Sequence, residues 1–186
     1  MTEKRGERGK KGQVWVETVI YTLIGLTIMG AIIAVVTPKI TQMNDKILLT
    51  QTIDSMNQMN EQIQDTFLYP GSQREITLMV KKGEYSIDGT NDKIEFLLKN
   101  TGLLYSQPNI PIKQGDLEIL TVEKPGGKKY DILLTLNYRD SNLTYQDKDQ
   151  NKTLTAAPLA YRLLVINNGA SGSSPKKQID IKLISG

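Results

Sequence analysis

Near its N-terminus the chain contains 21 consecutive residues without a charged side chain, Thr18–Pro38. The middle of this run, Val19–Val36, consists mainly of isoleucine, valine, leucine and alanine. About 20 apolar residues are enough for an α-helix to cross the hydrocarbon core of a bilayer. The sequence therefore predicts a membrane-spanning helix close to the N-terminus.

Charged residues around this run give the predicted helix a direction. Residues 1–12 contain five lysines and arginines and two glutamates, whereas residues 13–186 contain 18 basic and 18 acidic residues. Basic residues beside a membrane-spanning helix stay on the cytoplasmic side, so the N-terminus is predicted to be cytoplasmic and most of the chain to lie outside. The balanced charge of residues 13–186 argues against a general basic surface, and nucleic acid is not an expected partner.

A second helical pattern follows directly. Residues 39–68 carry apolar side chains at steps of three or four residues, which indicates an amphipathic helix. Pro38 removes one backbone donor and is predicted to bend the helix locally rather than end it, whereas Tyr69-Pro70-Gly71-Ser72 is predicted to end it. We expect this stripe to pack mainly on the chain's own C-terminal domain and partly on neighbouring copies; it consists of Ile40, Met43, Ile47, Ile53, Met56, Asn60, Ile63 and Phe67.

Beyond Gly71 the apolar period changes to two, which indicates β-strands. No helical pattern separates the strands, so the sheets are predicted to be antiparallel. The expected fold class is α+β: a long N-terminal helix followed by an antiparallel β-sandwich-like domain of seven or eight strands. Turn residues are predicted to divide the strands at Lys82-Gly83, at 88–91, at 125–127 and from Asn167-Asn168-Gly169 through Pro175.

Composition removes most kinds of catalytic site. The chain has no histidine and no cysteine, which excludes imidazole and thiolate metal sites, histidine-dependent triads and disulfides. The segment Asp147–Asn151 has the alternating oxygen ligands that begin a calcium loop, but Lys152 and Pro158 stand where that loop needs glycine and glutamate. We therefore expect a polar turn there, no metal, no cofactor and no enzymatic activity.

Two tripeptides match the acceptor sequence for N-glycosylation. They are Asn142-Leu143-Thr144 and Asn151-Lys152-Thr153, both expected in surface turns. Asn142 and Asn151 are therefore candidate modification sites.

The residues before the apolar run separate a removed secretory signal from a retained helix. Lys10 and Lys11 precede Gly12, and Gln13 is followed four residues later by Glu17. This arrangement resembles the class III signal of type IV pilin precursors, in which prepilin peptidase cuts after a glycine on the cytoplasmic side and leaves the helix attached. Glutamine at Gln13 is similar to the first mature residue of archaeal pilins. The chain departs from one common archaeal pattern at Trp15, where serine is usual, and at Tyr21, where leucine is usual.

The resemblance implies an organisation and a function. Residues 1–12 would be a cleaved leader, 13–38 the transmembrane and filament-core helix, 39–70 its amphipathic extension and 71–186 an extracellular antiparallel β domain. The new α-amino group of Gln13 would lie about one helical turn from Glu17 or come from a neighbouring copy, and this pairing is implied to register the subunits. The implied partners are other copies of the chain, prepilin peptidase and the assembly ATPase with its platform protein. The subunit would pass from the cell membrane into a surface filament, with adhesion as the expected role.

Other interpretations use the same helix differently. The helix can anchor a single extracellular β-domain binding module, with ligand binding as its function. It can also be a secretory signal cut near Ala31 or Ala34. A minor pilin or an archaeal flagellum-type subunit would share the processing but differ in the machine that it serves.

Overall fold

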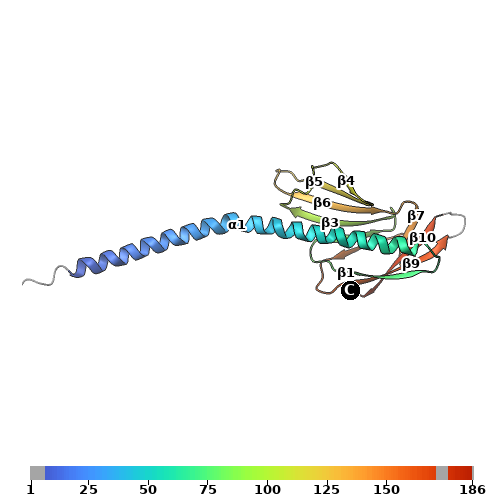
Figure 1. Ribbon diagram of the computed structural model, residues 1–186, viewed down its shortest axis with the longest axis horizontal. Helices are drawn as coiled ribbons and strands as arrows, with labels where there is room; N and C mark the ends of the chain where they lie inside the picture. Colours follow the sequence, from blue (N-terminus) through green and yellow to red (C-terminus); the bar gives the residue numbers. More distant parts are fainter. Residues whose placement is uncertain (1–6, 171–175, 186) are drawn as a thin grey trace, which may run out of the picture. The chain divides into compact units, whose positions relative to one another are not determined.

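The computed structural model describes residues 7–170 and 176–185 of the 186-residue chain. The chain divides into two compact units, Met1–Thr41 and Gln42–Gly186. One helix, α1 (Glu7–Thr66), supplies the described part of the first unit and continues into the second (Figure 1). Pro38 lies inside this helix and does not end it, as predicted.

The second unit combines the C-terminal part of α1 with β-strands, which confirms the α+β class predicted from the change in period. Seven of the strands contain alternating apolar residues of the kind that predicts a strand from sequence. In chain order, the strands are β1 (Gln73–Leu78), β2 (Glu84–Asp88), β3 (Lys93–Thr101), β4 (Ile112–Gln114), β5 (Leu117–Glu123), β6 (Tyr130–Asn137), β7 (Ser141–Tyr145), β8 (Asn151–Thr155), β9 (Tyr161–Ala170) and β10 (Lys177–Ser185).

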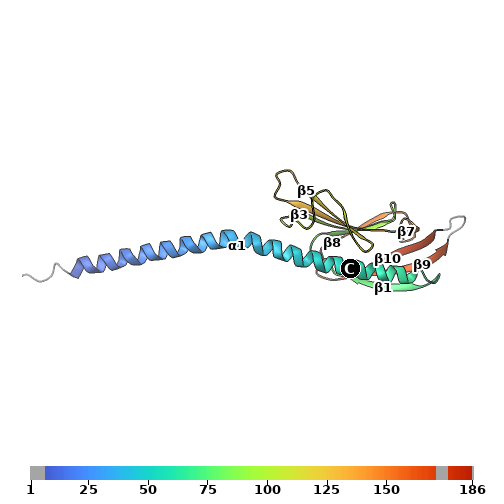
Figure 2. The ribbon, with the colours of Figure 1, turned by 45° about the horizontal axis from the view of Figure 1, so that its top comes forward.

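These strands form two sheets, seen from two directions in Figures 1 and 2. One sheet has the order β1-β9-β10-β7, and the other has the order β4-β5-β6-β3-β2-β8. Most neighbours are antiparallel, but β7 and β10 pair in parallel, with Leu143 opposite Ile179. The purely antiparallel expectation is wrong at this pair, because β8 and β9 lie between these strands in the chain and supply a crossover without any helix.

Three strands escaped the sequence pattern for visible reasons. β4 has three residues and all are exposed, so it has no apolar alternation. Every residue of β7 except Asn142 is buried, which hides its period. β8 contributes only Leu154 to the core. Alternation of apolar and polar residues reveals a strand only where one of its faces is buried and the other is exposed to solvent.

The core lies between the two sheets and is completed by α1. Leu49, Met56 and Ile63 on the helix are fully buried, and they pack in one cluster with apolar side chains of both sheets. A polar chain also links the helix to the larger sheet: the Tyr138 hydroxyl donates to Asn60 Oδ1 (2.9 Å), and Asn60 Nδ2 donates to Asp116 Oδ2 (2.9 Å). The C-terminal part of α1 is therefore an integral element of the β domain.

The turn predicted to begin at Asn167 is wrong for its first residues, because β9 continues to Ala170. Residues 171–175 lie outside the described part of the chain. Asn167 is completely buried, and its Nδ2 donates to Thr66 O (2.7 Å) and Tyr69 O (3.2 Å). The side chain that suggests a turn instead donates to the last carbonyl group of α1, at Thr66, and to that of Tyr69 just beyond the helix. The turns predicted at Lys82-Gly83, 88–91 and 125–127 are confirmed.

One buried tyrosine makes the stability of this core depend on alkaline pH. Burial raises the pKa of Tyr85 from 10 to about 12, although hydrogen bonds with Ser55 and Thr52 act in the opposite direction. The unfolded chain therefore ionises this phenol at a lower pH than the folded chain does, and the stabilisation present below pH 10 is lost as pH rises toward 12. We expect the loss at Tyr85 to reach about 2–3 kcal/mol. Urea unfolding between pH 8 and 12 should show a steeper decline for the wild type than for Tyr85→Phe, and parallel curves would contradict this assignment.

Candidate assembly helix

The first part of α1 is apolar and uncovered within the chain. None of its most apolar 18-residue stretch is buried within the chain. By length and composition this helix can cross a membrane. Trp15 and Tyr21 are 70% and 71% exposed. The other large apolar side chains exposed before Pro38 are Val14, Val16, Val19, Ile20, Leu23, Ile24, Leu26, Ile28, Met29, Ile32, Ile33, Val35 and Val36. Such a surface requires lipid or protein around it, because leaving it in water is unfavourable.

Four threonine hydroxyls in this segment are hydrogen-bonded to the helix itself. The hydroxyl groups of four threonines donate to the carbonyl group four residues earlier, at distances of 2.7–2.9 Å. In hydrocarbon no water can satisfy a hydroxyl, so internal pairing of this kind lowers the cost of placing threonine there. The threonines are Thr18, Thr22, Thr27 and Thr37.

The predicted processing residues also lie in α1. Lys10, Lys11, Gly12 and Gln13 belong to its first described turns, although their side chains are outside the described part of the structure. Glu17 lies on the same helix four residues after Gln13, and its side chain is exposed. This spacing is about one helical turn.

The apolar stripe predicted for residues 40–67 divides between two faces of the helix. Ile53, Met56 and Ile63 are buried against the β domain, whereas Met43 and Ile47 are 64% and 54% exposed. Ile40 is 52% exposed as well. The step of six residues from Ile47 to Ile53 turns the helix by about 600°, which places these two side chains on different faces. The prediction of packing on the own domain is therefore confirmed only for the later residues.

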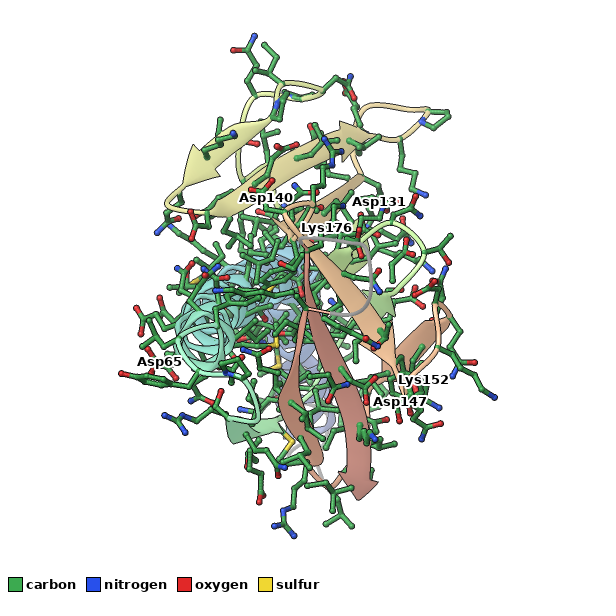
Figure 3. All side chains as sticks on the ribbon, turned by 90° about the vertical axis from the view of Figure 1, so that its right-hand side faces the viewer. Asp65, Asp131, Asp140, Asp147, Lys152 and Lys176 are labelled. Atoms are coloured by element: carbon green, nitrogen blue, oxygen red, sulfur yellow. The ribbon has the colours of Figure 1, made fainter. Side chains whose placement is uncertain are left out.

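We call the side of α1 opposite its buried residues the outward face. Met43 and Ile47 make it apolar at the start of the second unit, and from Thr50 onward its exposed residues are polar, as at Asp54 and Glu61. Figure 3 shows Asp65, near the end of the helix, directed away from the sheets. The outward face thus changes from apolar to polar within one turn after Ile47.

A buried carboxylate fixes the helix where it enters the β domain. Asp45 is 3% exposed; its Oδ1 lies 2.5 Å from Lys82 Nζ, and its Oδ2 accepts a hydrogen bond from the Thr101 hydroxyl (2.6 Å). Thr101 also accepts from the Leu103 backbone N–H (3.0 Å). Sequence analysis did not single out Asp45, but its position four residues before the buried Leu49 places it on the buried face, and that spacing could have revealed it.

The far end of the buried helix is tied down as well. The Ser72 hydroxyl donates to Thr66 O (2.7 Å), and Lys177 Nζ donates to Phe67 O (2.9 Å) while lying 5.9 Å from the centre of the Phe67 ring. Together with Asn167, these groups pair the last carbonyl group of α1, at Thr66, and the carbonyl groups of Phe67 and Tyr69 just beyond it. The helix is therefore held at both ends of the segment that packs on the sheets.

The two candidate glycosylation sites differ in access. Asn151 begins β8 at the edge of its sheet, and both Asn151 and Thr153 are exposed. Asn142 is half-buried in β7, and the buried Thr144 donates its hydroxyl hydrogen to Asp180 Oδ1 (2.7 Å). The geometry favours Asn151 as an acceptor.

The calcium-like segment begins at a tight turn beside β10. Asp147 Oδ2 pairs with Lys182 Nζ (2.7 Å), and this contact lowers the pKa of the Asp147 carboxyl. Figure 3 shows Asp147 and Lys152 at this side of the domain. Within the described ranges, no group of three or more acidic side chains is arranged to hold a metal ion.

Comparisons of the chain with protein-family models, curated protein sequences and solved structures gave no match. The sequence motif and the geometry of α1 therefore carry the functional interpretation.

Proposed function

We propose that this chain is a type IV pilin-like subunit, similar to archaeal pilins. Prepilin peptidase would cut it after Gly12, and an assembly ATPase with its platform protein would build copies into a surface filament. The α1 helices would pack together in the filament core, with the β domains outside. Before assembly, α1 would hold the subunit in the cell membrane. Adhesion is the role that we propose for the filament.

The observation that carries this proposal is the apolar outward face at Met43 and Ile47. These residues lie after Lys39, beyond the uncharged run that a bilayer would cover, and they are on the side of α1 that the own domain leaves open. A simple membrane anchor needs no apolar surface there. A helix that packs against helices of other copies does, because burial of apolar surface stabilises the contact.

The retained helix fits this function in a second way. Leu49, Met56 and Ile63 complete the core of the β domain, so one helix supplies both the exposed apolar segment and an integral part of the folded domain.

A membrane-tethered binding module is the second candidate, favoured by an open polar hollow of about 370 Å³ at the end of α1. Its walls include Phe67, Asn137, Asp140 and Lys177. A hollow of this size with converging polar groups is in the range used for small ligands. A ligand that binds at Asp140, with the protein confined to the membrane, would favour this candidate.

The double substitution Met43→Ser and Ile47→Ser tests the proposed function. We expect filament yield to fall at least about tenfold, because each lost apolar contact weakens association by about 1–2 kcal/mol. Folding of the β domain should not change, since both side chains are already exposed in the subunit. Electron microscopy and quantification of the sheared surface fraction measure the yield.

The matched control is Leu159→Ser, which removes an apolar side chain that is 69% exposed but lies outside the helix. It should leave filament yield unchanged. Equal yields from the double variant, the control and the wild type would refute a packing role for the outward face.

A further inference from the structure

Beyond Pro38, the charges on the exposed surface of α1 are separated by sign along the helix. Lys39 and Lys46 come first, and the acids Asp54, Glu61 and Asp65 follow; all five side chains are exposed. None has an oppositely charged residue three or four positions away, so no ion pair can form along the helix surface. Across the described ranges, the salt bridges found include none of these five residues.

Some charged residues of the β domain, by contrast, form ion pairs within the chain. Lys124 pairs with Asp131 (2.8 Å), and Arg162 pairs with Glu75 (2.6 Å). Local pairing of this kind neutralises surface charge within one subunit. The five charged side chains on α1 have no such partner in the described part of the chain and remain open to complementary groups of another copy.

The two signs have the same internal spacing. Lys39 and Lys46 are seven residues apart, and so are Asp54 and Glu61. If a second helix lies parallel to the first with an offset of 15 residues, both lysines face acids at once. When only the charges beyond Pro38 are counted, parallel offsets of 8, 19, 22 or 26 residues bring only one lysine opposite an acid. An offset of 15 residues corresponds to about 22 Å along the helix.

The same offset also places apolar side chains of a second copy against the apolar part of the outward face. It places Ile28 beside Met43 of the next copy and Ile32 beside Ile47. All four side chains are more than half exposed in the subunit. In chain order, Ile28, Ile32, Lys39 and Lys46 are separated by four, seven and seven residues. This spacing keeps their side chains on one face of a packed helix. The apolar surface is therefore compatible with the register that the charges select.

An antiparallel pair would also match both lysines, through Lys46 with Asp54 and Lys39 with Glu61. It would direct the two apolar segments in opposite directions. Copies inserted into one membrane through the same segment have the same orientation, so they meet in parallel. This step rests on the proposed function.

We infer that neighbouring copies pack their α1 helices in parallel with an axial offset of 15 residues. Lys46 of one copy contacts Glu61 of the next, and Lys39 contacts Asp54. The partner that this face recognises is thus a second copy of the chain. In this arrangement, two ion pairs set the register of the helices, and the contacts of Ile28 with Met43 and of Ile32 with Ile47 precede them along the helix.

Carbodiimide coupling of sheared native filaments tests this register directly, because the reagent joins a lysine amine to a carboxylate without a spacer. Within one chain, Lys46 and Glu61 are 15 residues apart on the same helix, about 22 Å, so an amide between them must link two copies. We expect cross-linked peptides that join Lys46 to Glu61 and Lys39 to Asp54. Peptides that join Lys46 to Asp54 and Lys39 to Glu61, or no cross-link at these lysines, would overturn the inference.

Charge reversal provides a second test in the cells that make the protein. Lys46→Glu should lower filament yield about fivefold or more, because each exposed ion pair contributes up to about a fivefold change in association. Adding Glu61→Lys should restore the yield, and Lys128→Glu, an exposed lysine of the β domain, should have no effect. If the wild type forms filaments and Lys46→Glu gives the same yield, or if the double variant does not recover the yield, the register is refuted and the proposed function still stands. Absence of wild-type filaments would refute both.

Discussion

The substitution Asp45→Ala is expected to lower the free energy of unfolding of the β domain by about 2–4 kcal/mol. Asp45 is buried and receives the Lys82 ammonium group and the Thr101 hydroxyl, so its removal leaves the buried Thr101 hydroxyl without its acceptor. Lys82 contributes less to the loss, because its side chain is 46% exposed and can be hydrated again. Urea unfolding of the full chain in detergent micelles, followed by circular dichroism, measures the change.

Asp54→Ala is the matched control, since it removes the same side chain from the exposed side of the same helix. Its effect on stability should stay within about 0.5 kcal/mol. Equal stability of the Asp45→Ala and Asp54→Ala variants would show that the buried carboxylate does not hold α1 on the domain.

The substitution Gly12→Leu is expected to abolish processing and, with it, filament formation. The resemblance to pilin precursors implies that the peptidase requires the small Gly12 before the cut, and a branched side chain would not fit that position. The subunit should then remain in the membrane at its full length. Intact mass of the membrane fraction distinguishes the two forms by the mass of residues 1–12.

Glu17→Ala separates processing from assembly. We expect it to be cut after Gly12 but to give fewer filaments, because the carboxylate that would pair with the new α-amino group is missing. Normal filament yield from Glu17→Ala would argue against its role in registering subunits, and efficient cutting of Gly12→Leu would argue against the peptidase site.

Much of the fold follows from periodicity in the sequence. The apolar run and the stripe of residues 53–63 give α1, and seven strands follow from alternation, because each of these elements has one buried face. The parallel pair of β7 and β10 depends on contacts between distant parts of the chain, which local patterns do not contain. The strands β4 and β7 were missed for another reason, because neither has one buried and one exposed face.

Buried polar residues show the limit of sequence reasoning most clearly. Asp45 and Asn167 resemble ordinary surface residues in the sequence, yet the structure buries both and uses them to fix the two ends of the packed helix. Their burial is favourable only because distant groups complete their hydrogen bonds. The candidate processing residues have the opposite character, since the motif from Lys10 to Glu17 is local and was found from sequence alone.

The outward face connects fold to function. Because the chain's own β domain covers one side of α1 and leaves Met43 and Ile47 exposed, the chain carries a surface that only other molecules can bury. The charges that follow would align those molecules, if they are other copies of the chain. Assembly through the helix is thus the function that the arrangement of the subunit supports best.

The most direct measurement is the intact mass and N-terminal sequence of the protein sheared from the surface of the cells that make it. A protein that starts at Gln13 and is recovered in the sheared filament fraction is the result that we predict, because it shows cutting after Gly12 and assembly together. A protein that starts at Met1 and is confined to the membrane, or one that starts beyond Ala31, would contradict the assignment as a pilin-like subunit.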